Sequence, residues 1–208
     1  MPLTLYPTQT SVLLRGISWG TYQQLLNDRG QTSCPRLAYD QGTLEIMTPN
    51  FEHEDLNRTL AQLIVAIAIA RNTDYCDAGS TTFDRQDLDK GFEPDSCFDF
   101  EQAAVVQGKK RIDLDADPPP ELVIEIDMSH PSLRKLPICA ALGIAEVWRD
   151  NGTRLEIYRL SQNDYQRAEV SEVIAGVTTT AIEHLLHLRR TMPGPEWFRI
   201  VMAWSQSH

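Results

Sequence analysis

The chain has 208 residues, of which 42% are hydrophobic and 23% charged, so it can bury the core of one full-sized domain. This composition excludes disordered, collagen-like and disulfide-scaffold proteins. The formal net charge of -10 argues against a protein that coats nucleic acid through a broadly basic surface. A local basic surface remains compatible with this charge.

Sparse cysteines and short apolar runs set further expectations. The four cysteines form no CxxC motif, so we expect thiols in the core and a reducing compartment. The longest apolar run, residues 60–70, is interrupted by Gln62 and is shorter than the roughly 18 residues that span a bilayer. Because the first residues also lack the pattern of a signal peptide, we expect a cytoplasmic protein with no membrane partner.

In chain order, residues 1–17 are expected to be irregular. A short helix is predicted over 18–28, where Ser18 is a suitable N-cap and Gly30 follows the helix end. Residues 36–47 place an Asp-Gln-Gly turn between two alternating apolar stretches, a pattern typical of a β-hairpin.

A long central helix is predicted from Asn50 onward. Its apolar residues recur at helical spacing, and acidic residues occupy its first turn, where they suit the helix dipole. Short strands are expected at 74–77, 81–84 and 95–100, and regular structure is weakest over 101–118.

The second half of the chain begins with its strongest predicted strand, residues 121–127, which is dense in β-branched side chains. A helix over 133–142, a hairpin over 144–158 and a helical C-terminal tail follow. With no internal repeat or flexible linker, this order predicts a single α/β (α+β) domain over 1–208.

Candidate chemistry starts at the strand 121–127. Its period of two places Val123, Glu125 and Asp127 on one face. A buried carboxylate needs a cation, a proton or strong donors, so Glu125 requires a partner. The segment after the strand can return Lys135 to its carboxyl end. Alternatively, both acids are solvated or paired with Arg at the strand end, and Lys135 is a solvated surface residue.

Asp95 lies 30 residues before Glu125 and is either a turn residue or a third member of this group. Together, Asp95, Glu125 and Lys135 have the chemistry of a single-metal phosphodiesterase. The carboxylates suit Mg²⁺, and an ammonium group can stabilise the charge of the transition state or lower the pKa of the attacking water. His53 opens the long helix and either points toward this site or caps its neighbours.

Other catalytic motifs are missing from the sequence. The His184–His187 pair lacks the glutamate of a zinc protease motif and is interpreted as structural. There is no P-loop, no GxGxxG after a strand and no GxSxG, so nucleotide-cofactor and serine-hydrolase functions have no support.

An ordered series of short blocks resembles the family of Uma-type "putative restriction endonucleases" over about residues 12–160. These blocks are Gly16-Ile-Ser-Trp, Tyr22-x-x-Leu-Leu, Tyr39-Asp-x-Gly-x-Leu-Glu-Ile-Met-x-Pro49, His53-Glu54, Glu93-Pro-Asp95, Pro120-Glu-Leu-Val-Ile-Glu-Ile126 and Lys135-Leu-x-x-x-Ala-x-x-Gly-Ile-x-Glu-Val-Trp148. The resemblance implies the PD-(D/E)XK nuclease superfamily, with a restriction endonuclease-like core of a mixed central sheet flanked by helices, preceded here by an N-terminal helix and hairpin. Residues 161–208 would then form a C-terminal strand and helix extension.

The resemblance also implies roles for individual residues. Asp95 and Glu125 would ligate Mg²⁺, or Mn²⁺ in its place, together with the backbone carbonyl of Ile126. Asp127 stands where the plain signature has Lys, so it becomes an additional ligand or base, and Lys135 supplies the amine. His53 and Glu45 are possible secondary site residues, and Cys139 stands where a Tyr is more usual.

The first functional hypothesis is therefore a Mg²⁺-dependent DNA endonuclease that acts as a homodimer, because two strands need two active sites. The acidic residue at 127 keeps a non-catalytic binding module open, and the lack of a basic stripe keeps a small-molecule metal hydrolase open. Residues 84–121 carry eleven acids and five bases, a balance of 5 - 11 = -6. DNA is thus expected to approach through the metal, Lys109–Arg111 or Arg134–Lys135.

Overall fold

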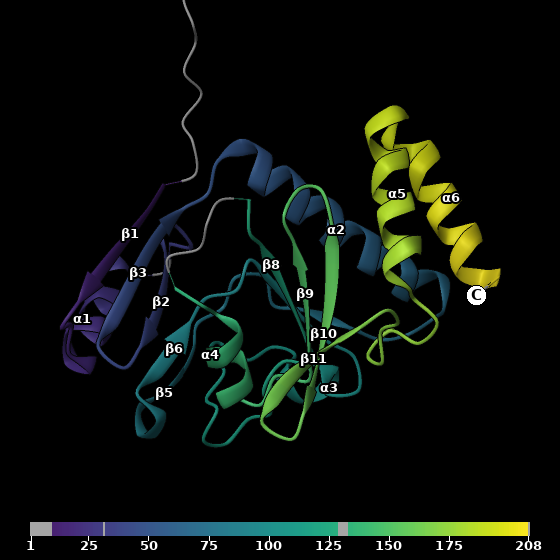
Figure 1. Ribbon diagram of the computed structural model, residues 1–208. Coiled ribbons are helices and arrows are strands. Elements are labelled where there is room, and N and C mark those ends of the chain that lie inside the picture. Colours follow the sequence, from purple (N-terminus) through teal and green to yellow (C-terminus); the bar gives the residue numbers. More distant parts are fainter. Residues whose placement is uncertain (1–9, 31, 129–132, 208) are drawn as a thin grey trace, which may run out of the picture.

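Two β-sheets organise the chain in this computed structural model, which describes residues 10–30, 32–128 and 133–207 (Figure 1). The five-stranded sheet is antiparallel and has the order β1 (Thr10–Arg15), β3 (Thr43–Thr48), β2 (Arg36–Asp40), β6 (Lys90–Phe92), β5 (Phe83–Arg85). The six-stranded sheet has the order β11 (Asp164–Ala168), β10 (Leu155–Ser161), β9 (Glu146–Asp150), β8 (Leu122–Ile126), β7 (Ser96–Asp99), β4 (Cys76–Asp77).

The six-stranded sheet is mixed. Its central strands β8 and β9 run parallel and are joined by a crossover that contains helix α4 (Leu136–Ala141), whereas the other neighbours in this sheet are antiparallel. A parallel pair requires such a crossover because a tight hairpin cannot connect parallel strands. The predicted mixed sheet flanked by helices is confirmed.

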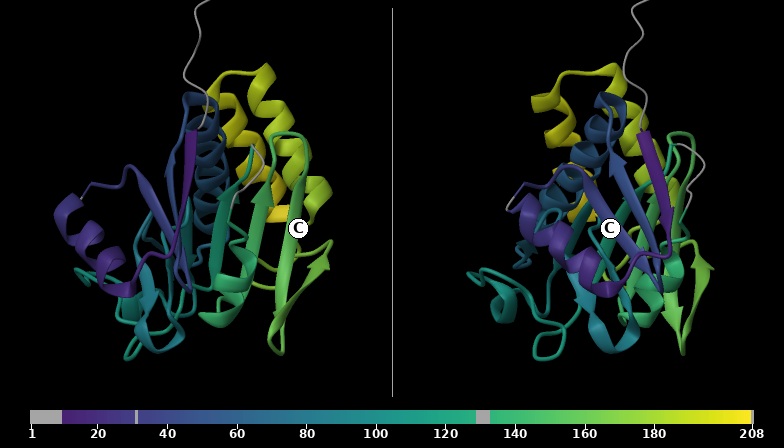
Figure 2. Two further views of the ribbon diagram at one scale, coloured as in Figure 1. Left: turned by 60° about the vertical axis from the view of Figure 1, so that its left-hand side comes forward. Right: turned by 90° about the vertical axis from the view of Figure 1, so that its left-hand side faces the viewer.

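Helices cover one face of the six-stranded sheet. The long helix α2 (Phe51–Ala70) lies on it, and α5 (Thr179–Thr191) and α6 (Gly194–Ser207) pack beside α2 (Figures 1 and 2). Leu122, Ile124 and Ile126 of β8 point into this helical layer. The opposite face meets α4 and the five-stranded sheet, and Val123 points into that second core.

The N-terminal elements follow the sequence closely. Helix α1 (Trp19–Arg29) starts after Ser18, whose Oγ accepts a hydrogen bond from the Thr21 backbone at 3.2 Å. The β2–β3 hairpin turns at Gln41 and Gly42, which both have positive φ, as the tightest hairpin turns require. The irregular structure expected for residues 1–17 is wrong over Thr10–Arg15, because these residues add β1 to the edge of the sheet by pairing with β3. Residues 1–9 lie outside the described residues.

Further differences have local causes. The helix expected over 133–142 begins only at Leu136, because Pro137 has no N–H and is tolerated in the first turn of a helix. Residues 129–132 lie outside the described part of the chain. The strand β6 was not expected, because this short segment pairs with the distant strand β2. The strand β11 pairs with the preceding strand β10 and lies in the strand and helix extension expected for 161–208. The short elements α3 (Ala103–Val106) and η1 (Gln86–Leu88) complete the set.

The cysteines are free thiols, but they are not all in the core. Cys97 and Cys139 are buried as expected, Cys76 is half-buried and Cys34 is exposed. None of the helices described here is long and apolar enough to cross a lipid bilayer.

Candidate active site

The three predicted site residues Asp95, Glu125 and Lys135 are brought together by two adjacent strands and a helix start. Asp95 directly precedes β7, Glu125 lies in β8, and Lys135 is the residue that caps α4. Strand pairing aligns Asp95 with the end of β8, where its Oδ2 accepts a hydrogen bond of 2.7 Å from the Ile126 backbone N–H. The tertiary fold therefore assembles a group that the sequence spreads over 41 residues (135 - 95 + 1).

Asp95 is buried and lies next to two basic side chains. Arg36 Nη1 lies 2.5 Å from its Oδ1, and His53 Nε2 lies 3.2 Å from its Oδ2. Burial opposes ionisation, but the contact with His53 and the charges of Lys135 and Arg36 outweigh it and lower the pKa of Asp95 to about 2. Asp95 is therefore a fixed negative charge at neutral pH.

Buried Glu125 forms an ion pair with Lys135, whose side chain is partly exposed. Lys135 Nζ donates a hydrogen bond of 2.6 Å to Glu125 Oε2. Burial and the nearby charge of Asp95 raise the pKa of Glu125 to about 7, against the opposing effects of Lys135 and Arg36. Burial alone would lower the pKa of Lys135, but the carboxylates of Glu125 and Asp95 raise it above its usual value, so Lys135 stays charged.

Two carboxylate oxygens at the centre of this group lack hydrogen-bond donors within the described ranges. Glu125 Oε1 is buried and accepts no hydrogen bond, and Asp95 Oδ1 has only the ion-pair contact with Arg36. A buried carboxylate oxygen without a donor carries a free-energy cost that a cation would remove. The donor set consequently fits a hard divalent cation.

Side-chain ligands for such an ion are few. Among the residues whose placement is described, no group of three or more His, Cys, Asp or Glu side chains could hold a metal ion. A cation at Asp95 and Glu125 would thus be completed by backbone oxygen and water. Mg²⁺ is the ion that typically keeps several waters in this way.

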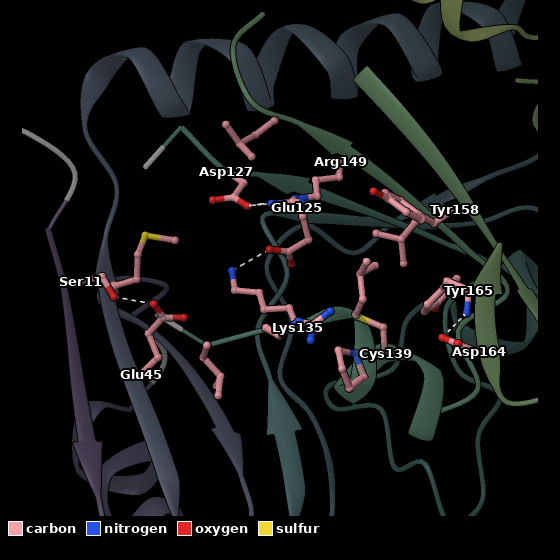
Figure 3. Close-up of a pocket in the computed structure, with 17 residues that line it drawn as sticks. Ser11, Glu45, Glu125, Asp127, Lys135, Cys139, Arg149, Tyr158, Asp164 and Tyr165 are labelled. Carbon is pink, nitrogen blue, oxygen red and sulfur yellow. Dashed lines mark hydrogen bonds and ion pairs between the residues drawn. The ribbon is translucent and has the colours of Figure 1, made fainter. Parts of the chain in front are cut away.

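A pocket of ≈ 440 Å³ opens next to Glu125 and Lys135 (Figure 3). It lies between the six-stranded sheet, α4 and the β1–β3 edge of the other sheet. Asp95 is buried and does not line this pocket. The lining residues that carry charge or a hydroxyl are Ser11, Glu45, Glu125, Asp127, Arg134, Lys135, Arg149, Tyr158, Asp164 and Tyr165.

Asp127 lines the pocket but forms an ion pair with Arg149. Its Oδ2 accepts hydrogen bonds from Arg149 Nε at 2.9 Å and from Arg149 Nη2. Glu125 and Arg149 are cross-strand partners, so their side chains lie on the same face of the sheet. Asp127 is two residues after Glu125 and therefore shares that face, within reach of Arg149. The structure thus pairs Asp127 with Arg149, as one of the sequence alternatives anticipated.

The two secondary residues occupy different positions. His53 is fully buried beside Asp95, so it points into the site. Glu45 lies across the pocket from Glu125, on β3, where Ser11 Oγ donates a hydrogen bond of 2.5 Å to it (Figure 3). Glu45 is also one of the acids that raise the pKa of Lys135.

Sequence reasoning missed Arg36 and Asn57. Asn57 Nδ2 donates a hydrogen bond of 3.0 Å to the Asp95 carbonyl, and Asn57 Oδ1 accepts one of 2.9 Å from Ser96 Oγ. The signal for Asn57 was its spacing of four residues from His53, which places both polar side chains on one helix face. Arg36 has no comparable signal, because it opens an ordinary hairpin strand.

The basic residues expected to contact DNA differ in whether they are already paired with an acid and whether they line the pocket. Lys109 is paired with Asp117, and Arg111 lies 3.3 Å from Asp84. Arg134 is exposed and lines the pocket mouth. Positive charge at the pocket therefore comes from Arg134, Lys135 and the partly exposed Arg149.

Two comparisons with known proteins bear on the family and the fold. A family model described as "Putative restriction endonuclease" (Uma2) matches residues 19–189. A solved structure described as a "putative nuclease belonging to DUF820" from Anabaena variabilis superposes with a TM-score of 0.55, at 14% sequence identity, over 81% of this chain and 98% of that chain. At this identity the likeness shows a common fold. No curated protein matches the chain.

Proposed function

The chain belongs to the Uma2 family of restriction endonuclease-like proteins, and on this premise we propose that it is a Mg²⁺-dependent endonuclease that hydrolyses DNA phosphodiester bonds. The observation that carries the proposal is the ion pair of buried Glu125 with Lys135, next to buried Asp95 and at the wall of an open pocket. A structural ion pair has no need of a second buried carboxylate, whereas a metal-dependent phosphodiesterase does.

Asp95 and Glu125 would hold the cation, with the carbonyl of Ile126 as a further ligand. When bound, Mg²⁺ would polarise the phosphoryl oxygen and favour deprotonation of a water molecule. The oxygens that lack donors, Glu125 Oε1 and Asp95 Oδ1, support this assignment. Mn²⁺ prefers similar oxygen ligands and is expected to substitute.

In the proposed reaction, the oxygen of water forms a bond to phosphorus and one bridging P–O bond breaks. The proton of the water passes to solvent, and the departing oxygen takes a proton from solvent. Lys135 is held in its charged form by Glu125, so it acts as a cation and not as a base. Its ammonium group would orient the water and stabilise the charge that develops on the phosphoryl oxygens.

Arg149 and Asp127 have supporting roles in this proposal. Asp127 stands where the signature has Lys, and Arg149 neutralises its charge. Without Arg149, a third carboxylate at the site would repel the phosphate. Asp127 is accordingly proposed as an outer residue of the site and Lys135 as the amine donor. The homodimer and the cytoplasmic location stay predictions of the sequence, and sedimentation would test the first against the monomer mass of 23.5 kDa.

The test combines activity and metal binding. Purified protein with Mg²⁺ or Mn²⁺ should nick or cut DNA, and Asp95→Asn and Glu125→Gln should abolish this activity. Independently, 5 mM Mn²⁺ should raise the melting temperature of the wild type but not of either variant, because a ligand stabilises only the state that binds it. Equal cleavage by wild type and both variants would exclude this site.

A further inference from the structure

The part of the pocket that lies beyond Lys135 is walled by aromatic rings. Tyr158 is the cross-strand partner of Val147, and Tyr165 is the partner of Leu160, two residues along the same strand as Tyr158. Both rings therefore project from the sheet face that also carries Glu125. In Figure 3 they lie on the side of the pocket opposite Glu45, with Cys139 of α4 below.

Both tyrosine rings are held in place by their own hydroxyl groups. Tyr158 Oη donates a hydrogen bond of 2.8 Å to Glu156 Oε2, and Tyr165 Oη donates one of 2.7 Å to the Ile144 carbonyl. The hydroxyls are thus occupied, while ring surface remains in the pocket lining. A ring that is already fixed loses little conformational freedom when a flat ligand stacks on it.

Charge and size limit what this part of the pocket can receive. Arg134, Lys135 and Arg149 contribute positive charge to the pocket lining, which also carries acids, among them Asp164. The volume of ≈ 440 Å³ lies in the range of small-molecule sites, roughly 300–1,000 Å³. A pocket of this size can admit one nucleotide but not a stacked base pair.

We propose that the pocket segment formed by Tyr158 and Tyr165 receives a single unstacked nucleobase of DNA. This inference rests on the proposed nuclease function and specifies its substrate as a strand with an unpaired or extruded nucleotide. The base stacks on a tyrosine ring, and the adjoining phosphate lies near Lys135 and Arg149. Stacking on aromatic side chains is the usual way in which proteins hold unpaired bases.

The overall charge agrees with this substrate class. With a net charge of -10, the chain has little long-range attraction for a duplex. A single nucleotide inserted into a pocket gains its affinity from stacking and from a few local cations. Binding therefore does not require a broadly basic face.

The first experiment measures binding without catalysis, in EDTA, by fluorescence of a 15-nucleotide DNA strand that contains one central 2-aminopurine. The wild type should bind this strand more tightly than the same strand in a full duplex, and should quench its fluorescence. Tyr158→Leu should weaken binding by roughly 5- to 150-fold, the effect of losing one stacked base. Tyr158→Phe keeps the ring and loses only the hydroxyl that fixes it, so it should weaken binding much less than Tyr158→Leu.

A second measurement avoids reliance on a variant that fails to fold. In a duplex whose one strand carries a single unpaired 2-aminopurine, replacing that nucleotide by an abasic residue should weaken binding by the wild-type protein, as measured by anisotropy of an end label. Equal affinity for single strand and duplex, or an unchanged affinity for the abasic strand, would overturn the inference.

Cleavage in Mg²⁺ separates this inference from the function on which it rests. Tight binding of the unpaired base without cleavage of any DNA would support the pocket and refute the nuclease. Cleavage of intact duplex that is unaffected by Tyr158→Leu would support the nuclease and refute the pocket.

Discussion

Lys135 Nζ donates a hydrogen bond to Glu125 Oε2 across a connection of which residues 129–132 lie outside the described chain. The lysine precedes the first helical residue of α4, and the glutamate lies in the central parallel strand. Their contact fixes the crossover against the end of the strand, where the Ile126 backbone also donates a hydrogen bond to Asp95. The pair therefore serves both the folding of this region and its proposed chemistry.

Replacing Lys135 should separate these two contributions. Lys135→Met keeps most of the aliphatic stem and removes the ammonium group. DNA cleavage should fall by about 10²- to 10³-fold, the usual cost of losing one electrostatic stabiliser of the transition state. Glu125 would lose its donor and become protonated, which limits the loss of stability to about 1–3 kcal/mol.

Urea denaturation and rates of plasmid nicking would check this prediction. Adding Glu125→Gln to Lys135→Met provides the matched control, since an amide at position 125 needs no proton to be neutral and should recover part of the lost stability. Nicking by Lys135→Met at the wild-type rate would contradict a catalytic contribution from the ammonium group.

Asn57 should be a positioning residue for Asp95. Asn57→Ala removes the donor to the Asp95 carbonyl and the acceptor for Ser96, both in a buried environment. Unpaired buried polar groups cost about 1–3 kcal/mol, so a corresponding loss should appear in urea denaturation. Cleavage should also fall, since the start of β7 would no longer be fixed against α2.

The exposed Arg58 provides the comparison on the same helix. Arg58→Ala should change stability by no more than about 0.5 kcal/mol, as is usual for surface positions. A result in which Asn57→Ala and Arg58→Ala have equal effects on both stability and cleavage would show that Asn57 does not position Asp95.

The sequence predicts this site unevenly, and the reason is physical. Asp95, Glu125 and Lys135 are recognisable because they belong to short blocks in a fixed order, and the alternation of the strand places Glu125 opposite the α2-facing residues. Arg36 and Tyr158 become part of the site only through sheet pairing, which has no local sequence signal. The N-terminal helix and hairpin were predictable because their caps, Ser18 and Gly30, and the Gln41–Gly42 turn set the conformation of the residues next to them in the sequence. Strand β1, in contrast, forms only by pairing with a strand about 30 residues away.

The thiols should react in an order set by their exposure. Cys34 is exposed, Cys76 is half-buried, and Cys97 and Cys139 are buried, with burial raising the pKa of the last three thiols. Since the thiolate is the reactive form, a colorimetric disulfide reagent should label one thiol rapidly in the native protein and four in guanidinium. Cys34→Ser should remove the rapid phase, and a rapid phase that persists in this variant would contradict the assigned exposure.

Asp99 should make stability depend on pH. It is buried in β7, and burial together with the charge of Glu121 raises its pKa to about 6, although the backbone hydrogen bond from Glu121 opposes this. An unfolded aspartate has a pKa of about 3.9. The folded state thus holds the proton more tightly, so its contribution to stability is complete below about pH 4 and is lost as the pH rises through about 6.

Asp99→Asn removes this titration while keeping the shape of the side chain. Compared with wild type, the variant should gain up to about 2–3 kcal/mol in its free energy of unfolding between pH 4 and pH 8, because two pKa units correspond to that difference. Urea denaturation at both pH values measures the change, and Asp74→Asn at an exposed position corrects for the loss of one negative charge. A stability difference between Asp99→Asn and wild type that is the same at pH 4 and pH 8 would mean that Asp99 ionises as easily in the folded protein as in the unfolded chain, and that the polar surroundings of β7 compensate for its burial.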